Sequence, residues 1–257
     1  MSRRGIALFA GTEVEVIAET ARVSETLGYS SFWLNHPGAT DGIVRLAYAA
    51  RATTGIALGV GVVPLHTRTA ESVIETVRSE RLPRERLLLG IGSAGPGAFR
   101  VAREGAALLK QELGCSVVMG ALSPAACRLA GEIADGVLFN WLTPEYARRS
   151  AAWVEEGAQR AGRKRPQLYA YVRVAYGRGA RARIEEEGER YAGGSYGGHF
   201  ARMGVKPLET ALAVSDPDAL TAGLDRWDDI VDEVVLRLLP ASGELDAHLE
   251  LIHAGSR

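Results

Sequence analysis

The sequence has little of what membrane, secreted or nucleic-acid-binding proteins need. Its 30 Lys and Arg residues are balanced by 31 Asp and Glu, a net charge of -1, so no basic field is available to attract nucleic acid or an anionic membrane. The longest apolar runs are strand-sized, well below the roughly 20 residues that span a bilayer. The first residues also lack the length and cleavage site of a secretory signal. We therefore expect a cytoplasmic protein without a nucleic-acid or membrane partner.

Cysteine is scarce, and the chain contains only Cys115 and Cys127. They form no C-x-x-C motif and have no histidine-rich neighbourhood, so neither a zinc site nor a disulfide framework is expected. We predict that both thiols are buried as small hydrophobic side chains and that the protein binds no metal.

Short apolar runs alternate along the chain with segments of helical periodicity. Eight runs have the length and composition of strands, and they cover residues 5–11, 30–35, 56–65, 86–95, 115–121, 135–141, 167–177 and 233–241. Strict alternation of strands and helices predicts parallel strands joined by helical crossovers. Eight such units in 257 residues predict one domain over residues 1–257 with an α/β fold, the closed (β/α)8 TIM barrel.

The connection between the seventh and eighth predicted strands, residues 178–232, is much longer than a loop and one helix require. It contains a helical run at 180–192, a glycine-rich stretch at 192–205 that we expect to be flexible, and a second helical run after the sequence SDPDAL. This extended insertion would suit a lid over the mouth of the barrel. Alternatively, its helices only pack against the barrel and have no role in binding.

The fourth run contains G-x-G-x-x-G as Gly90, Gly92 and Gly95. In a dinucleotide-binding fold this motif follows the first strand, and an acidic residue ends the next strand to hold the ribose. Here the motif follows the fourth strand, and Ala121, Leu122 and Ser123 stand where the acidic residue belongs. We therefore interpret the glycines as clearance at the mouth of a barrel strand and not as an NAD site.

Four segments together resemble a known family. They are LGYSSFWLNHP at 27–37, IALGVGVVPLHTR at 56–68, RLLLGIGSAG at 86–95 and SPAACRLAGEIADGVLFNWLTPE at 123–145. The chain resembles the bacterial luciferase-like superfamily, and within it the branch that uses the deazaflavin coenzyme F420. The resemblance implies a TIM barrel and hydride transfer to or from a flavin-type ring.

The resemblance also implies particular site residues at the ends of the second and third strands. Asn35 and His36 stand where the branch carries an Asp-His pair, so His36 matches as the catalytic proton partner, whereas Asn35 departs from the pattern at a cofactor-binding position. The departure would weaken the carboxylate support of the imidazole. The bond between Gly61 and Val62 matches a non-proline cis peptide in a bulge that backs the cofactor ring. The alternative for His36 is a loop histidine that caps a turn. The alternative for Gly61 is a small strand residue at a crowded point.

Further matches lie at the ends of the fourth and sixth strands. Gly92 and Ser93 match cofactor-binding positions, but Ser93 and Ala94 replace a Glu of the sugar-phosphate dehydrogenases of the branch, which argues against a sugar-phosphate substrate. Asn140 would hydrogen-bond a ring edge or a ribityl hydroxyl. Trp141 would contact the cofactor or serve only in packing.

We expect the phosphate tail of the cofactor where the fifth strand meets the next helix, at Gly120, Ala121, Leu122 and Ser123. Backbone amides at a helix start lack intrahelical acceptors, and Pro124 at the first helical position removes no useful donor. The alternative is an ordinary helix capped by Ser123.

The leading hypothesis is an oxidoreductase that transfers hydride between coenzyme F420 and a small organic substrate. The alternatives are an FMN-dependent luciferase-like monooxygenase and a non-catalytic flavin-binding homologue. The third alternative rests on the segment between the fourth and fifth strands, which is short for the superfamily. Relatives commonly dimerise, so a homodimer is expected by analogy.

Overall fold

The computed structural model describes residues 2–37, 39–194 and 196–256; Met1, Gly38, Ser195 and Arg257 lie outside the described residues. The strands are β1 Arg3–Leu8, β2 Ser31–Leu34, β3 Ala57–Pro64, β4 Leu87–Gly92, β5 Ser116–Gly120, β6 Gly136–Asn140, β7 Gln167–Tyr176, β8 Ala211–Val214 and β9 Glu233–Leu238. The helices are α1 Val14–Thr26, α2 Gly42–Ala52, α3 Ala70–Ser79, α4 Ala98–Leu113, α5 Pro124–Ile133, α6 Pro144–Arg160, α7 Ala180–Ala192, α8 Gly197–Met203, α9 Pro217–Asp225 and α10 Leu245–Gly255. Two 3-10 turns, Arg84–Arg86 and Pro207–Thr210, complete the order.

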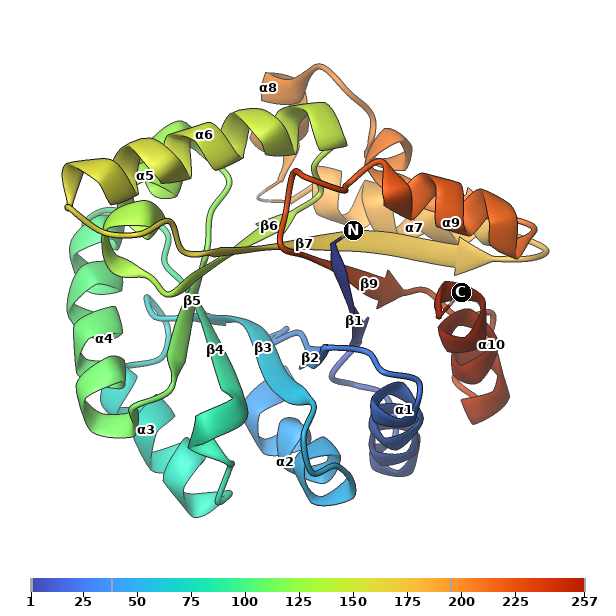
Figure 1. The fold of residues 1–257 in the computed structure, drawn as a ribbon, viewed down its shortest axis with the longest axis horizontal. Coiled ribbons are helices and arrows are strands. Elements are labelled where there is room, and N and C mark those ends of the chain that lie inside the picture. Colours follow the sequence, from blue (N-terminus) through green and yellow to red (C-terminus); the bar gives the residue numbers. More distant parts are fainter. Residues whose placement is uncertain (1, 38, 195, 257) are drawn as a thin grey trace.

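Eight of the strands close into a barrel. Each strand from β1 to β6 pairs in parallel with the next one along the chain. β7 then pairs with β9, and β9 pairs with β1, which closes the ring. The helices surround this ring (Figure 1). The predicted TIM barrel is confirmed: seven of the predicted strand runs contain one ring strand each, and the first run, 5–11, overlaps β1, which begins earlier at Arg3.

The total number of strands differs from the prediction, because β8 lies outside the ring. Arg173 of β7 pairs with Arg237 of β9 on one edge and with Ala211 of β8 on the other edge. β8 therefore lies on the same edge of β7 as β6. The pairing of β6 with β7 ends at Asn140, opposite Tyr171, and β8 pairs with β7 beyond that point. β8 has four residues, too few to show periodicity, and it forms only because β7 projects beyond β6.

The insertion is more ordered than the sequence suggested. The helical run predicted at 180–192 is confirmed as α7, and the run after SDPDAL is α9. The glycine-rich stretch predicted to be flexible instead contains helix α8. Its buried residues His199 and Phe200 pack against Trp141 and Tyr146, so tertiary contacts outweigh the weak helix propensity of glycine.

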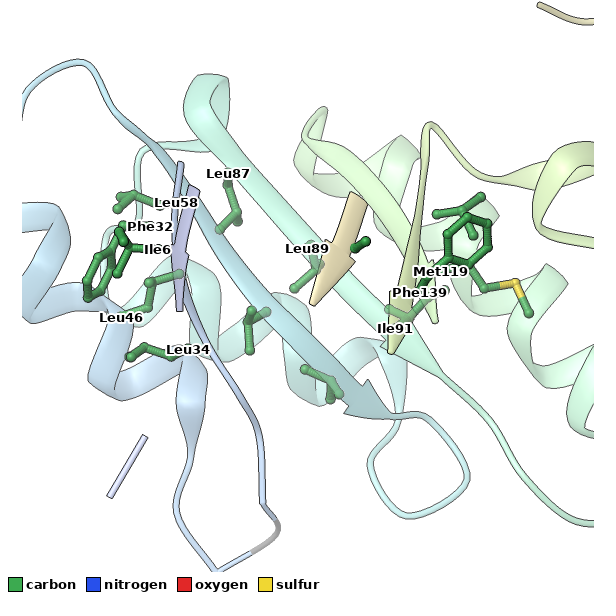
Figure 2. Close-up of a cluster of buried hydrophobic side chains, with 14 of the residues drawn as sticks. Ile6, Phe32, Leu34, Leu46, Leu58, Leu87, Leu89, Ile91, Met119 and Phe139 are labelled. Atoms are coloured by element: carbon green, nitrogen blue, oxygen red, sulfur yellow. The ribbon is translucent and has the colours of Figure 1, made fainter. Parts of the chain in front are cut away.

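Alternating strand residues build two apolar layers. One set faces the surrounding helices, and it includes Ile6, Phe32, Leu58 and Leu89 of the strands and Leu46 of α2 (Figure 2). The other set fills the barrel, and it consists of Ala7, Trp33, Val118, Leu138, Tyr169, Tyr171 and Val235. Each fully buried large apolar side chain contributes about 1.5–3 kcal/mol. This packed interior closes the barrel below the C-terminal ends of the strands.

Both cysteines are buried and unbridged, as predicted. Burial raises the pKa of Cys115 to about 11 and the pKa of Cys127 to about 12. Within the described residues, no helix is long and apolar enough to cross a membrane. That part of the chain also contains no group of three or more His, Cys, Asp or Glu side chains arranged to hold a metal ion.

Candidate active site

A cavity of about 450 Å³ opens at the C-terminal ends of strands β2 to β7, and we call it the first cavity. Ten of the twelve predicted site residues line it: Asn35, His36, Gly61, Val62, Gly92, Ser93, Gly120, Ala121, Leu122 and Asn140. The remaining lining residues are Pro37, Pro64, His66, Ala94, Leu138, Tyr171, Tyr191 and Tyr196. Tyr191 ends α7 and Tyr196 precedes α8, so the insertion forms part of the cavity wall.

Ser123 and Trp141 do not line the first cavity. The Ser123 hydroxyl accepts a hydrogen bond from the Ala126 amide at 3.2 Å and caps α5, with Pro124 at the first helical position. Trp141 is fully buried, and its indole ring lies beneath the Arg173 guanidinium, 3.8 Å from the ring centroid. The structure thus shows Ser123 as a helix cap and Trp141 in packing, and their contacts with a cofactor stay predictions.

His36 lies just beyond β2 with its side chain only 7% exposed. The Gly42 amide donates a hydrogen bond to His36 Nδ1 at 3.1 Å, which fixes the proton of the neutral ring on Nε2. Burial is the main cause that lowers the pKa of His36, and Arg68 lowers it further, whereas Asp41 opposes them. The imidazole is therefore neutral at pH 7.

Asp41 supplies the carboxylate that Asn35 cannot. Asp41 Oδ1 lies 3.6 Å from His36 Nδ1, and Oδ2 accepts a hydrogen bond from Arg68 at 2.8 Å. Asn35 instead accepts a hydrogen bond from the Ala10 amide at 2.7 Å and ties β2 to the loop after β1. No sequence pattern singled out Asp41, because a helix N-cap aspartate is common.

The peptide between Gly61 and Val62 is cis, as the resemblance implied, and lies where the pairing of β3 with β4 shifts register between Val60 and Val63. Small residues surround this bulge. A Cβ on Gly61 would lie 2.5 Å from Tyr171 Oη, and a Cβ on Gly92 would lie 2.9 Å from a Val62 methyl carbon. The glycines therefore let the bulge approach the side chains around it.

Two hydroxyl groups in the cavity lining have no hydrogen-bond partner. Tyr171 Oη and Ser93 Oγ are both buried and both unsatisfied in the described protein. Burial raises the pKa of Tyr171 well above its usual range, so its hydroxyl remains a donor. A buried hydroxyl without a partner costs about 1–3 kcal/mol. A flavin or deazaflavin ring has polar atoms along its edges, so these two unsatisfied hydroxyls are candidate donors to such a ligand.

Asn140 connects the first cavity to a buried ion pair. Its Nδ2 donates to Tyr196 Oη at 2.7 Å, and its Oδ1 accepts a hydrogen bond from Arg173. Arg173 is fully buried and pairs with Glu187 of α7 at 3.3 Å. Sequence patterns did not single out these two residues, because the long insertion separates α7 from the other walls of the mouth.

Known proteins share this architecture. The family model for luciferase-like monooxygenases matches residues 2–112 and 96–254. The chain belongs to the luciferase-like monooxygenase family. It is 26% identical over 196 residues to 5,10-methylenetetrahydromethanopterin reductase of Methanolobus tindarius, a match that covers 62% of this chain and 60% of that relative. The chain thus spans well under two thirds of the curated relative.

Solved structures align over nearly the whole chain. The coenzyme F420 dependent tetrahydromethanopterin reductase from Methanopyrus kandleri has a TM-score of 0.76 at 19% identity, and the alignment covers 98% of this chain and 97% of that one. The monooxygenase RslO1 from Streptomyces bottropensis has a TM-score of 0.78 at 16% identity, with 99% and 97% covered. At these identities the two structures establish the fold.

Proposed function

We propose that the protein transfers hydride between coenzyme F420 and a small organic substrate, with His36 as the proton partner. The observation that carries the proposal is the first cavity itself. A neutral, buried imidazole stands at one side of it, the bulge at Gly61 and Val62 forms part of its wall, and two of its lining residues, Ser93 and Tyr171, have buried hydroxyls without a hydrogen-bond partner. The similarity to two methanopterin reductases, one of them F420-dependent, supports the choice of cofactor.

Different residues of the chain would hold different parts of the cofactor. The backbone at Gly61 and Val62 would support the ring, and Tyr171 and Ser93 would donate hydrogen bonds to its polar edge. The segment from Gly120 to Ser123 would receive the phosphate tail at the start of α5. When bound, the deazaflavin supplies the centre that accepts or donates hydride.

His36 would move the proton that accompanies hydride transfer. In the imidazolium form, Nδ1 would carry a proton and would no longer accept from the Gly42 amide; that proton would face the Asp41 carboxylate, and Nε2–H would be the acid toward the substrate. Loss of the Nε2 proton would leave the neutral ring protonated on Nδ1 beside Asp41, the tautomer opposite to the resting one that the Gly42 amide favours. The reverse step makes Nε2 the base for oxidation of an alcohol.

The second candidate function is an FMN-dependent monooxygenase, which the similarity to RslO1 favours. A flavin-binding homologue without turnover is the third. Purification from a host that makes both F420 and FMN separates these functions, because the visible spectra of the two cofactors differ. We expect the deazaflavin to be retained, and retention of FMN alone would favour the monooxygenase. Turnover on any substrate excludes the third function.

A further inference from the structure

A second cavity, of about 410 Å³, lies beside the first at the ends of β1 and β9. Arg237 of β9, Glu187 and Arg190 of α7, and His248 of α10 contribute its charged and titratable groups, together with Glu13. Glu13 and Arg190 are both exposed and of opposite sign. The buried groups therefore decide the electrostatic character of the second cavity.

Two buried arginines face this part of the barrel, but they share one carboxylate. Arg173 and Arg237 are register partners on β7 and β9. Glu187 pairs with Arg173, and the described residues provide no carboxylate within salt-bridge distance of Arg237. Arg237 is nevertheless only 4% exposed. A buried cation without a counter-charge costs several kcal/mol, so this position favours an anion from outside the chain.

The hydrogen bonds of Arg237 leave the edge suited to an oxyanion open. Within the described residues, the side chain of Arg237 makes one hydrogen bond, which Nη1 donates to the Leu238 carbonyl oxygen at 3.0 Å. The Nε–H and Nη2–H groups form the other edge of the guanidinium, and this pair matches the two oxygens of a carboxylate or phosphate.

His248 adds an acceptor near the same cavity. Its Nδ1 donates to the Glu244 carbonyl oxygen at 2.8 Å, which leaves Nε2 as an acceptor in the neutral ring. Burial and the nearby Arg237 lower the pKa of His248, whereas its hydrogen bond to Glu244 opposes them. A ligand hydroxyl would find an acceptor here.

We propose that the second cavity is an anion-binding site, in which Arg237 holds the carboxylate or phosphate group of a small organic molecule through Nε and Nη2. The anion can come from the substrate or from the phosphate tail of the cofactor, and the two sources share this chemistry. Binding to Arg237 requires no turnover, so the proposal stands or falls separately from the hydride-transfer function.

The test measures the melting temperature of the apoprotein while chloride is replaced by inorganic phosphate or by acetate at constant ionic strength. Ligands that bind only the folded state raise this temperature saturably. For at least one of the two anions, we expect a saturable rise in the wild type and an increase of the half-saturating concentration by at least about tenfold in Arg237→Met. The matched control is Arg100→Met, which removes the same charge from an exposed position on α4 and should leave the response unchanged.

A second variant keeps the proposal testable if Arg237→Met does not fold. Arg237→Lys keeps the charge but removes the paired donors, so acetate should bind about tenfold more weakly while phosphate binding changes less. A wild type that shows no saturable response to either anion would overturn the proposal. Variants at position 237 that respond like the wild type would overturn it as well.

Competition then identifies the source of the anion. If F420 displaces phosphate and a deazaflavin without the phosphate tail does not, the second cavity receives the cofactor tail, which then does not lie at Gly120 to Ser123. If phosphate still binds with F420 saturating, the site belongs to the substrate. Either result leaves Arg237 as the anion ligand.

Discussion

Replacement of Gly61 by alanine tests whether the wall of the first cavity is packed as described. The added Cβ would lie 2.5 Å from Tyr171 Oη and 2.6 Å from Leu138 Cδ2. Tyr171 cannot swing away freely, because it is buried and packs edge-on against Trp33 with ring centroids 6.0 Å apart. Overpacking of this kind costs about 1–3 kcal/mol.

For a protein of this size, each kcal/mol lowers the melting temperature by roughly 2–4 °C, so Gly61→Ala should melt about 2–12 °C below the wild type. The assay is thermal unfolding followed by circular dichroism. Gly198→Ala is the matched control, because a Cβ there would meet no heavy atom within 4 Å. It should melt at or slightly above the wild-type temperature.

The double variant Gly61→Ala/Tyr171→Phe isolates one of the two clashes. Removal of Oη relieves the 2.5 Å contact and leaves the contacts with Leu138 Cδ2 and with the Cζ of residue 171, 3.1 Å away. Part of the lost stability should therefore return as a coupling of about 0.5–3 kcal/mol. Strictly additive effects, or a single Gly61→Ala variant as stable as the wild type, would refute the described packing.

Three further predictions concern other residues. His36→Ala should lower turnover by about 10²- to 10⁴-fold while cofactor affinity stays within a few-fold; steady-state kinetics near the wild-type rate would make His36 structural. Ser123→Asp should preserve thermal stability, because aspartate is an equally good N-cap, yet weaken cofactor binding by more than roughly tenfold and partly recover with salt; unchanged affinity would move the phosphate tail elsewhere. Burial raises the pKa of Glu233 despite its hydrogen bond from Ser31, so its stabilising contribution is present below the unfolded pKa and is lost as pH rises through the folded pKa. In urea unfolding, Glu233→Gln should therefore gain stability relative to the wild type as pH rises above the unfolded glutamate pKa of about 4.3 toward the raised folded pKa, and a constant difference would contradict this sign.

The barrel was predictable because its signals are local and repeated. Each ring strand carries a run of apolar residues bounded by turn residues, and α7 has clear helical spacing. By contrast, β8 and α8 form through contacts with β7 and with Trp141, which no local pattern encodes. Glycine content at 192–205 therefore pointed to flexibility, whereas the buried His199 and Phe200 determine the fold there.

The first cavity was largely predictable, because its residues follow consecutive strands whose C-terminal ends meet at one edge. The electrostatic partners were harder to predict. Asp41 reaches His36 from a helix cap, and Glu187 reaches Arg173 from the insertion. Both pairings depend on the path of a connection through space. No sequence pattern indicated that Arg237 has no carboxylate partner among the residues the structure describes, since that property depends on every neighbouring element.

Equilibrium titration with F420 and with FMN, followed by tryptophan fluorescence, tests the central claim most directly. The proposed function predicts that the apoprotein binds F420 at least about tenfold more tightly than FMN, a difference of about 1.4 kcal/mol. Tyr171→Phe should weaken F420 binding, because the unsatisfied hydroxyl in the first cavity then offers the ring no donor. Equal affinities for the two cofactors, or tighter binding of FMN, would contradict the assignment and favour the monooxygenase.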